Sequence, residues 1–125
     1  MQRVDFSSLV GQVLTRVSSP DPTQLYFETE DKRYSLYHEQ DCCESVTIED
    51  INGNLDDLIG TPILVAEEVS NHENPSDVDM SERYQDSFTW TFYKLATRKG
   101  YVTIRWYGSS NGYYSESVSF SEEAK

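Results

Sequence analysis

The residues that could carry chemistry gather between positions 34 and 49. This stretch holds His38, Cys42, Cys43 and several carboxylates. Thiolates, imidazoles and carboxylates are zinc ligands, so the residue types suit a zinc site. Neighbouring side chains of a strand point to opposite faces, however, and one ion would rarely take both cysteines. The second histidine, His72, lies in a distant polar segment, and we therefore expect no metal.

A catalytic cysteine is the next interpretation of the same stretch. A reactive thiolate needs a nearby cation or a helix N-terminus. The neighbours here are Glu39, Asp41 and Glu44, whose negative charges disfavour a thiolate. We interpret the cysteines instead as one small buried side chain and one near a turn. A cysteine-dependent enzyme stays an alternative, which two slowly alkylated thiols would remove.

Oxygen-bearing side chains alternate over positions 50–56, as in a calcium loop. An EF-hand loop requires Gly at its sixth position and Glu at its twelfth, where this chain has Leu55 and Thr61. A turn followed by a capped helical turn explains the pattern better. Phosphate-binding, dinucleotide-binding and serine-nucleophile motifs are absent from the sequence. We therefore predict a protein that is not an enzyme and needs no cofactor.

Aromatic residues around the turn at 108–112 suit binding better than catalysis. Trp106 precedes this turn, and Tyr34 occupies the matching place earlier in the chain. Aromatic rings with a neighbouring amide, cation and carboxylate could stack a base and hold its edge. The alternative is that about half of these rings belong to the core. The candidate binding residues are Tyr37, His38, Asp41, Glu44, Arg105, Tyr107, Asn111, Tyr113, Tyr114 and Glu116.

The elements that must position these residues follow one order twice. Each half reads as a helical turn, a strand, a hairpin and a strand. In the first turn, we expect Asp5 to cap the N-terminus and Gly11 to end the helix. The expected elements are 5–11, 12–17, 24–29 with 33–37, and 45–51 in the first half, and 54–60, 63–69, 88–95 with 101–107, and 113–120 in the second.

Recurring sequence supports an internal duplication. The pattern of residues 5–11 returns at 54–60, and Glu-Ser-Val at 44–46 returns at 116–118. These matches occur in the same order along both halves. We predict a single domain, 1–125, with pseudo-repeats at about 5–51 and 54–120. Its class is mainly β with minor α, an antiparallel sandwich or partly open barrel.

Two segments stand outside this repeat. Residues 70–87 are acidic and nearly free of apolar side chains, and we expect a mobile insertion there. Residues 121–125 are polar and are expected to form a tail.

The net charge limits the classes of partner that the chain can bind. The chain has 125 residues and a net charge of −12, which argues against direct binding to nucleic acid or an anionic membrane. It favours a basic protein partner. No apolar run approaches the roughly 18 residues of a membrane span. The start of the chain lacks a signal-peptide core, so we expect a cytoplasmic protein.

Two runs, HEQDCCE at 38–44 and WYGSSNGYYSE at 106–116, carry a resemblance. With their flanking segments they resemble a small domain family of unknown function found in phages and bacteria. The resemblance covers roughly Leu9 to Phe120 and implies a small intracellular protein of phage origin. Small acidic phage proteins are often inhibitors of host machinery, which links the resemblance to a function by analogy and not by a mechanism.

Three functions follow. The first is a phage-encoded, non-enzymatic inhibitor that binds a bacterial defence or nucleic-acid-handling protein through its acidic surface. The second is a small-molecule binder, such as a sponge for a nucleotide signal, which would need Arg33, Lys99 and Arg105 to cluster if it took a phosphate. The third is the cysteine-dependent enzyme.

Overall fold

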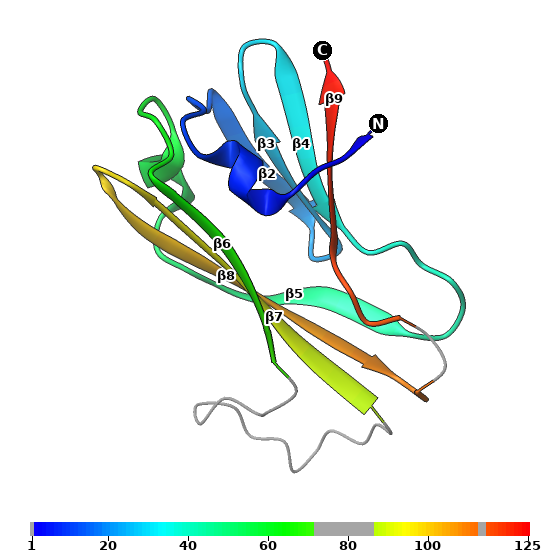
Figure 1. Ribbon diagram of the computed structural model, residues 1–125. Helices are drawn as coiled ribbons and strands as arrows, with labels where there is room; N and C mark the ends of the chain where they lie inside the picture. Colours follow the sequence, from blue (N-terminus) through cyan, green and yellow to red (C-terminus); the bar gives the residue numbers. More distant parts are fainter. Residues whose placement is uncertain (1, 72–86, 113–114) are drawn as a thin grey trace.

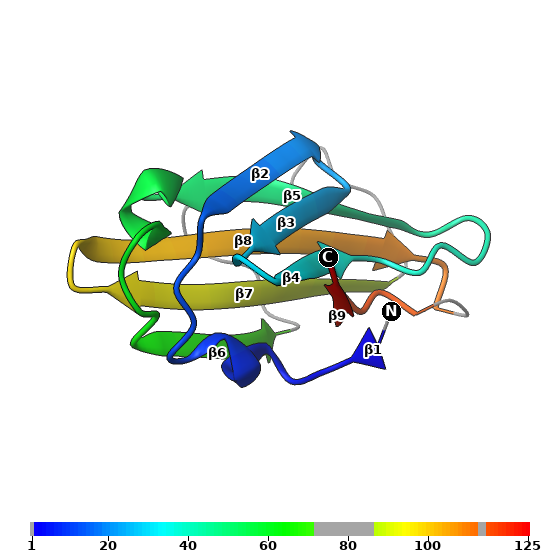
Figure 2. The same ribbon diagram turned by 90° about the horizontal axis from the view of Figure 1, so that it is seen from above.

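The computed structural model describes residues 2–71, 87–112 and 115–125. Its strands form two antiparallel sheets packed face to face, an open sandwich (Figures 1 and 2). The five-stranded sheet has the order β1 (Gln2–Arg3), β9 (Ser119–Ala124), β4 (Lys32–Tyr37), β3 (Gln24–Glu28), β2 (Arg16–Asp21). The four-stranded sheet has the order β5 (Ser45–Asn52), β8 (Gly100–Ser110), β7 (Ser87–Thr97), β6 (Val65–Asn71). The predicted mainly β sandwich is confirmed.

The two sheets exchange strands. One contains β2, β3 and β4 from the first half of the chain together with β9 from the second. The other contains β6, β7 and β8 from the second half together with β5 from the first. The last strand of each half therefore crosses to the sheet built by the other half. Both crossing segments, 38–44 and the one that leads into β9, pass the same end of the sandwich (Figure 1).

Two short 3₁₀ helices, η1 (Phe6–Leu9) and η2 (Leu55–Leu58), form where the helical turns are predicted. A glycine with positive φ lies two residues after each helix, Gly11 at +87° and Gly60 at +90°. The hydrogen bonds that follow are reciprocal. The Gly11 amide donates to the Ile63 carbonyl at 2.8 Å, and the Gly60 amide donates to the Leu14 carbonyl at 2.9 Å.

Aromatic rings fill the space between the sheets. Phe6 of η1 contacts Phe27, Tyr93 and Phe120, with ring centroids 4.7 to 6.2 Å apart. Tyr34 stacks on Phe120. The inner strand positions and η1 thus share one core that joins both sheets.

The expected strand over 12–17 is wrong, because β2 spans Arg16–Asp21. Pairing with β3 decides its place: Val17 lies opposite Phe27 and Ser18 opposite Tyr26. Pro20 is tolerated there because β2 is an edge strand, where a missing N–H costs no ladder bond.

The expected strand over 113–120 and the expected tail at 121–125 are also wrong. Strand β9 begins at Ser119 and runs to Ala124. Its glutamates lie beside cations of β4, with Glu122 3.7 Å from Lys32 and Glu123 3.9 Å from Arg33. A sequence that looks like a polar tail therefore pairs as a strand.

Two smaller expectations need correction. Asp5 makes no side-chain capping bond, whereas Asn54 at the matching position accepts a bond from the Asp56 amide. Of the expected mobile insertion at 70–87, both ends belong to β6 and β7. Positions 72–86 lie outside the described residues.

No helix within the described ranges is long and apolar enough to cross a membrane.

Candidate functional site

The two crossing segments meet at one end of the sandwich, which we call the crossover end (residues 38–44, 108–112 and 115–118). His38 follows β4, and its Nδ1 donates to the Ser117 carbonyl at 2.7 Å. In the ladders, Tyr37 lies opposite Ser119 and Ser45 lies opposite Ser109. Segments from both halves of the chain therefore meet at one end of the sandwich.

Glu44 lies at the centre of the 38–44 segment and its side chain is buried. Its Oε2 accepts from His38 Nε2 at 2.9 Å and from the Asp41 amide at 3.1 Å. Its Oε1 accepts from the Cys42 amide at 2.9 Å and from Gln40 Nε2 at 3.0 Å. Every partner is a donor, so the carboxylate form satisfies all four bonds.

This environment fixes the charge of Glu44. Burial raises its pKa, but hydrogen bonds from the Cys42 amide, His38 and the Asp41 amide outweigh burial and lower the pKa to about 2. A general acid or base near neutral pH needs a pKa close to 7 and access to the reacting proton. Glu44 has neither, and it acts by closing the segment on itself.

Glu116 occupies the matching place in the second half and is also buried. Its Oε1 accepts from the Thr89 hydroxyl at 2.7 Å, and its Oε2 accepts from the Ser110 hydroxyl at 2.6 Å. The main chain here passes so close to β8 that a Cβ at Gly108 would lie 2.8 Å from the Glu116 carbonyl oxygen. Glu116 thus joins its segment to β7 and β8.

The cysteines differ from the expectation. Cys42 and Cys43 lie in a bend and both are exposed, so the prediction that one of them is buried is wrong. Their sulfurs are joined in a disulfide. In the described part of the chain, no three His, Cys, Asp or Glu side chains are arranged to hold a metal ion.

The aromatic candidates separate. Tyr37 lies on the outer face of the five-stranded sheet, where its hydroxyl bonds to Ser121. Tyr107 lies on the outer face of the four-stranded sheet, and the centroid of its ring is 4.5 Å from that of Trp90. Arg105 lies over the same Trp90 ring, with Cζ 5.3 Å from its centroid. Asp41 and Asn111 are exposed at the crossover end, and Tyr113 and Tyr114 are outside the described residues.

Sequence reasoning misses a hollow on the outer face of the five-stranded sheet. It measures about 140 Å³ and is lined by Gln24, Tyr26, Arg33, Ser35 and Tyr37. The Arg33 guanidinium lies 3.9 Å from the centre of the Tyr26 ring. An adjoining hollow of about 250 Å³ shares Tyr37 and includes His38. The alternation of apolar and polar residues in β3 and β4 predicts which side chains lie on the outer face, but it does not predict that they enclose a hollow.

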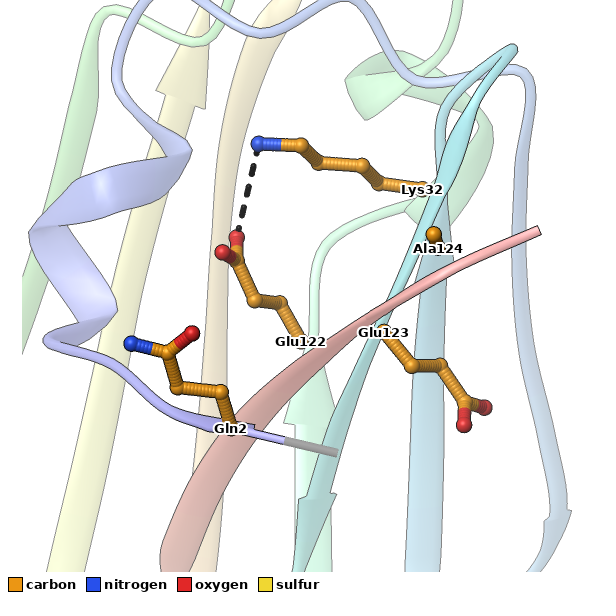
Figure 3. Close-up of a pocket in the computed structure, with 5 residues that line it drawn as sticks. All are labelled: Gln2, Lys32, Glu122, Glu123 and Ala124. Atoms are coloured by element: carbon orange, nitrogen blue, oxygen red, sulfur yellow. Dashed lines mark ion pairs between the residues drawn. The ribbon is translucent and has the colours of Figure 1, made fainter.

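A wider hollow of about 590 Å³ lies near the two chain ends (Figure 3). Lys32 and Glu122 face each other there as an ion pair, while Glu123 points away. No aromatic ring lines it, and it contains none of the predicted site residues.

A known protein family matches most of this chain. A family model, described as domain of unknown function DUF7448, matches residues 7–120. The chain belongs to this family. The DUF7448 match spans both crossing segments and all the candidate site residues. No curated protein and no solved structure matches the chain significantly.

Proposed function

We propose that this chain is a non-enzymatic binding protein that takes a basic protein partner on its acidic surface. In its finer form, the proposal is a phage-encoded, cytoplasmic inhibitor of a bacterial host protein. One observation supports this proposal. The carboxylates of Glu44 and Glu116 are buried and bonded within the fold, whereas other carboxylates are exposed and accessible to a partner.

The cations of the five-stranded sheet are largely matched within the chain. Arg3 lies 2.7 Å from Glu39, Lys32 3.7 Å from Glu122, and Arg33 3.9 Å from Glu123. This sheet therefore offers an external partner little net charge.

Near β6 the balance is different. Glu67 and Glu68 are exposed, and Asp5 is close enough to Glu68 to act on its charge. Within the ranges the structure describes, none of these three carboxylates is part of an ion pair. A cationic partner would gain attraction here and associate faster at low salt.

Capture from a bacterial lysate at low and at high salt tests the proposal. We expect a protein that binds at about 50 mM salt and is released at about 500 mM, because screening weakens contacts between exposed charges. An empty eluate, or capture that salt does not change, would contradict the proposal.

A second candidate function, binding of a small aromatic molecule, is favoured by the Tyr26–Arg33 stack beside Tyr37. The cluster needed for a phosphate is not present. Lys99 donates to the Ile59 carbonyl, and Arg105 lies on the other sheet from Arg33. A thermal-shift panel of nucleotides and nucleosides tests this: a ligand at 100 times its Kd adds about 2.7 kcal/mol to the free energy of unfolding.

A further inference from the structure

Edge strands expose unpaired backbone N–H and C=O groups, and most proteins blunt them. Three of the four edges in the described chain are blunted. β1 has two residues, and β2 contains Pro20 and a register shift between Ser18 and Asp21. β5 has a shift between Ile48 and Asp50, and its Ile48 amide is already bonded to the Pro22 carbonyl at 2.6 Å.

β6 is the exception. All seven of its residues pair with β7 in one continuous register, without a shift and without proline. The segment before it is tied to the chain at 11–12, because Ile63 exchanges backbone bonds with Gly11 and Gln12. From Glu67 onward every residue of β6 is exposed. Among the described residues, η1 packs against β6 and no second strand pairs with it, which leaves a regular backbone edge at Glu67–Ser70.

In the described part of the chain, η1 packs against β6, and the exposed glutamates of the strand add negative charge to its edge. Glu67 is on the outer side of the sheet, opposite Lys94 in the ladder, and Glu68 is on the inner side, opposite Tyr93. Burial raises the pKa of Glu68. A hydrogen bond with the Tyr93 hydroxyl lowers this pKa, and the negative charge of Asp5 raises it further. An added strand would place its own side chains beside Glu67 and Val69 on one face and beside Glu68 on the other.

We propose that β6 binds its partner by strand addition, pairing with an extended segment that carries lysine or arginine at adjacent positions and β-branched residues around them. Backbone hydrogen bonds supply affinity, and Glu67 and Glu68 select the cations. This inference rests on the proposed function, since it names the surface that takes the basic partner.

Charge also argues against a second copy of this chain as the occupant. Antiparallel pairing of β6 with itself, in the register centred on Glu67 and Glu68, would bring these residues of the two copies opposite each other. Like charges directly opposite in a ladder are destabilising.

The test uses the full chain and a fluorescent octapeptide, Thr-Val-Lys-Lys-Val-Lys-Thr-Val, with a control peptide in which glutamate replaces lysine. Binding is measured by anisotropy for wild type, for E67Q E68Q and for E30Q D31N. Both double variants remove two carboxylates from exposed positions, so they share one net charge. We expect saturable binding of the lysine peptide only, weakened about tenfold or more by E67Q E68Q and less than about twofold by E30Q D31N.

Three results would overturn strand addition: no saturable binding, equal weakening by both double variants, or a dimer of the chain alone in sedimentation that E67Q E68Q strengthens. The lysate experiment, repeated with E67Q E68Q, separates the two proposals. If salt-sensitive capture persists unchanged, the binding function stands and the β6 surface is wrong. If wild type captures nothing, the binding function fails, and the peptide result still decides whether β6 accepts a strand.

Discussion

The crossover end and the β6 edge contrast in what they do with their polar groups. At the crossover end, Glu44 and Glu116 are buried and bonded to partners in the same chain. On β6, Glu67 and Glu68 are exposed, and within the described ranges no second strand pairs with β6. Residues that look chemically unusual in the sequence therefore stabilise the fold, and the surface open to a partner has ordinary residues. Substitutions at the crossover end should change stability, whereas substitutions on β6 should change binding.

The largest effect is expected from Gly108→Ala. The new Cβ would lie 2.8 Å from the Glu116 carbonyl oxygen and 2.9 Å from its Cβ, and a backbone neighbour cannot rotate away. Overpacking of this kind should lower the free energy of unfolding by about 3 kcal/mol. Urea denaturation measures this change in the free energy of unfolding. The control is Ser109→Ala in the same strand, which should change the free energy of unfolding by less than about 0.5 kcal/mol. An equal effect of both substitutions would show that the crossing is not tightly packed.

The two buried glutamates should respond differently to glutamine. At Glu44 every partner is a donor, so a new NH₂ group faces donors and loses bonds. At Glu116 the partners are hydroxyls, which can rotate to accept, and Glu116→Gln should cost about 1 kcal/mol or less. Glu44→Gln should therefore be the more destabilising of the two in urea. The reverse order would contradict the assignment of Glu44 as the acceptor that closes its segment.

Acid should weaken the crossover end through Glu44. Its pKa in the folded protein is about 2, below the ordinary value of 4.5. The unfolded state binds a proton first, so this contribution is complete above about pH 4.5 and is lost as pH falls toward about 2. Chemical denaturation of wild type and Glu44→Gln across this range measures it. The two curves should converge at low pH, and parallel curves would argue against the shift.

The smallest effect is expected from the cysteines. A disulfide between adjacent residues closes almost no loop and restricts the unfolded chain little. Both cysteines are exposed, and the bonds to Glu44 in this segment use the Cys42 amide but neither cysteine side chain. Replacing both with serine should change the free energy of unfolding by less than about 0.5 kcal/mol. A decrease in the free energy of unfolding close to that of Gly108→Ala would mean that the disulfide, and not Glu44, closes the segment.

Much of the architecture can be predicted from the sequence because it follows local patterns. Alternating apolar residues predict β3, β4, β7 and β8, and the repeated heptad predicts both 3₁₀ helices. The exchange of β5 and β9 between sheets cannot be predicted this way, because strand partners are set by packing across the whole chain. The assignment of Glu122 and Glu123 to a tail fails for the same reason, since their partners, Lys32 and Arg33, lie far away in sequence.

The candidate site is predicted in part. The Glu-Ser-Val repeat marks two segments that lie at one end of the sandwich, and His38 bonds to the Ser117 carbonyl in the second of them. The sequence does not tell whether a glutamate is exposed or buried among donors, because the donors of Glu44 include backbone amides. The β6 edge gives no sequence signal, since the position of a strand in a sheet depends on which strands pair in the folded chain.

Hydrogen exchange of the backbone amides, with and without the lysine octapeptide, tests most directly the claim that β6 binds while the crossover end only stabilises. We expect slower exchange across Glu67–Ser70 in the complex and unchanged exchange in 38–44 and 115–118. Slower exchange in those crossing segments, with none across β6, would contradict it.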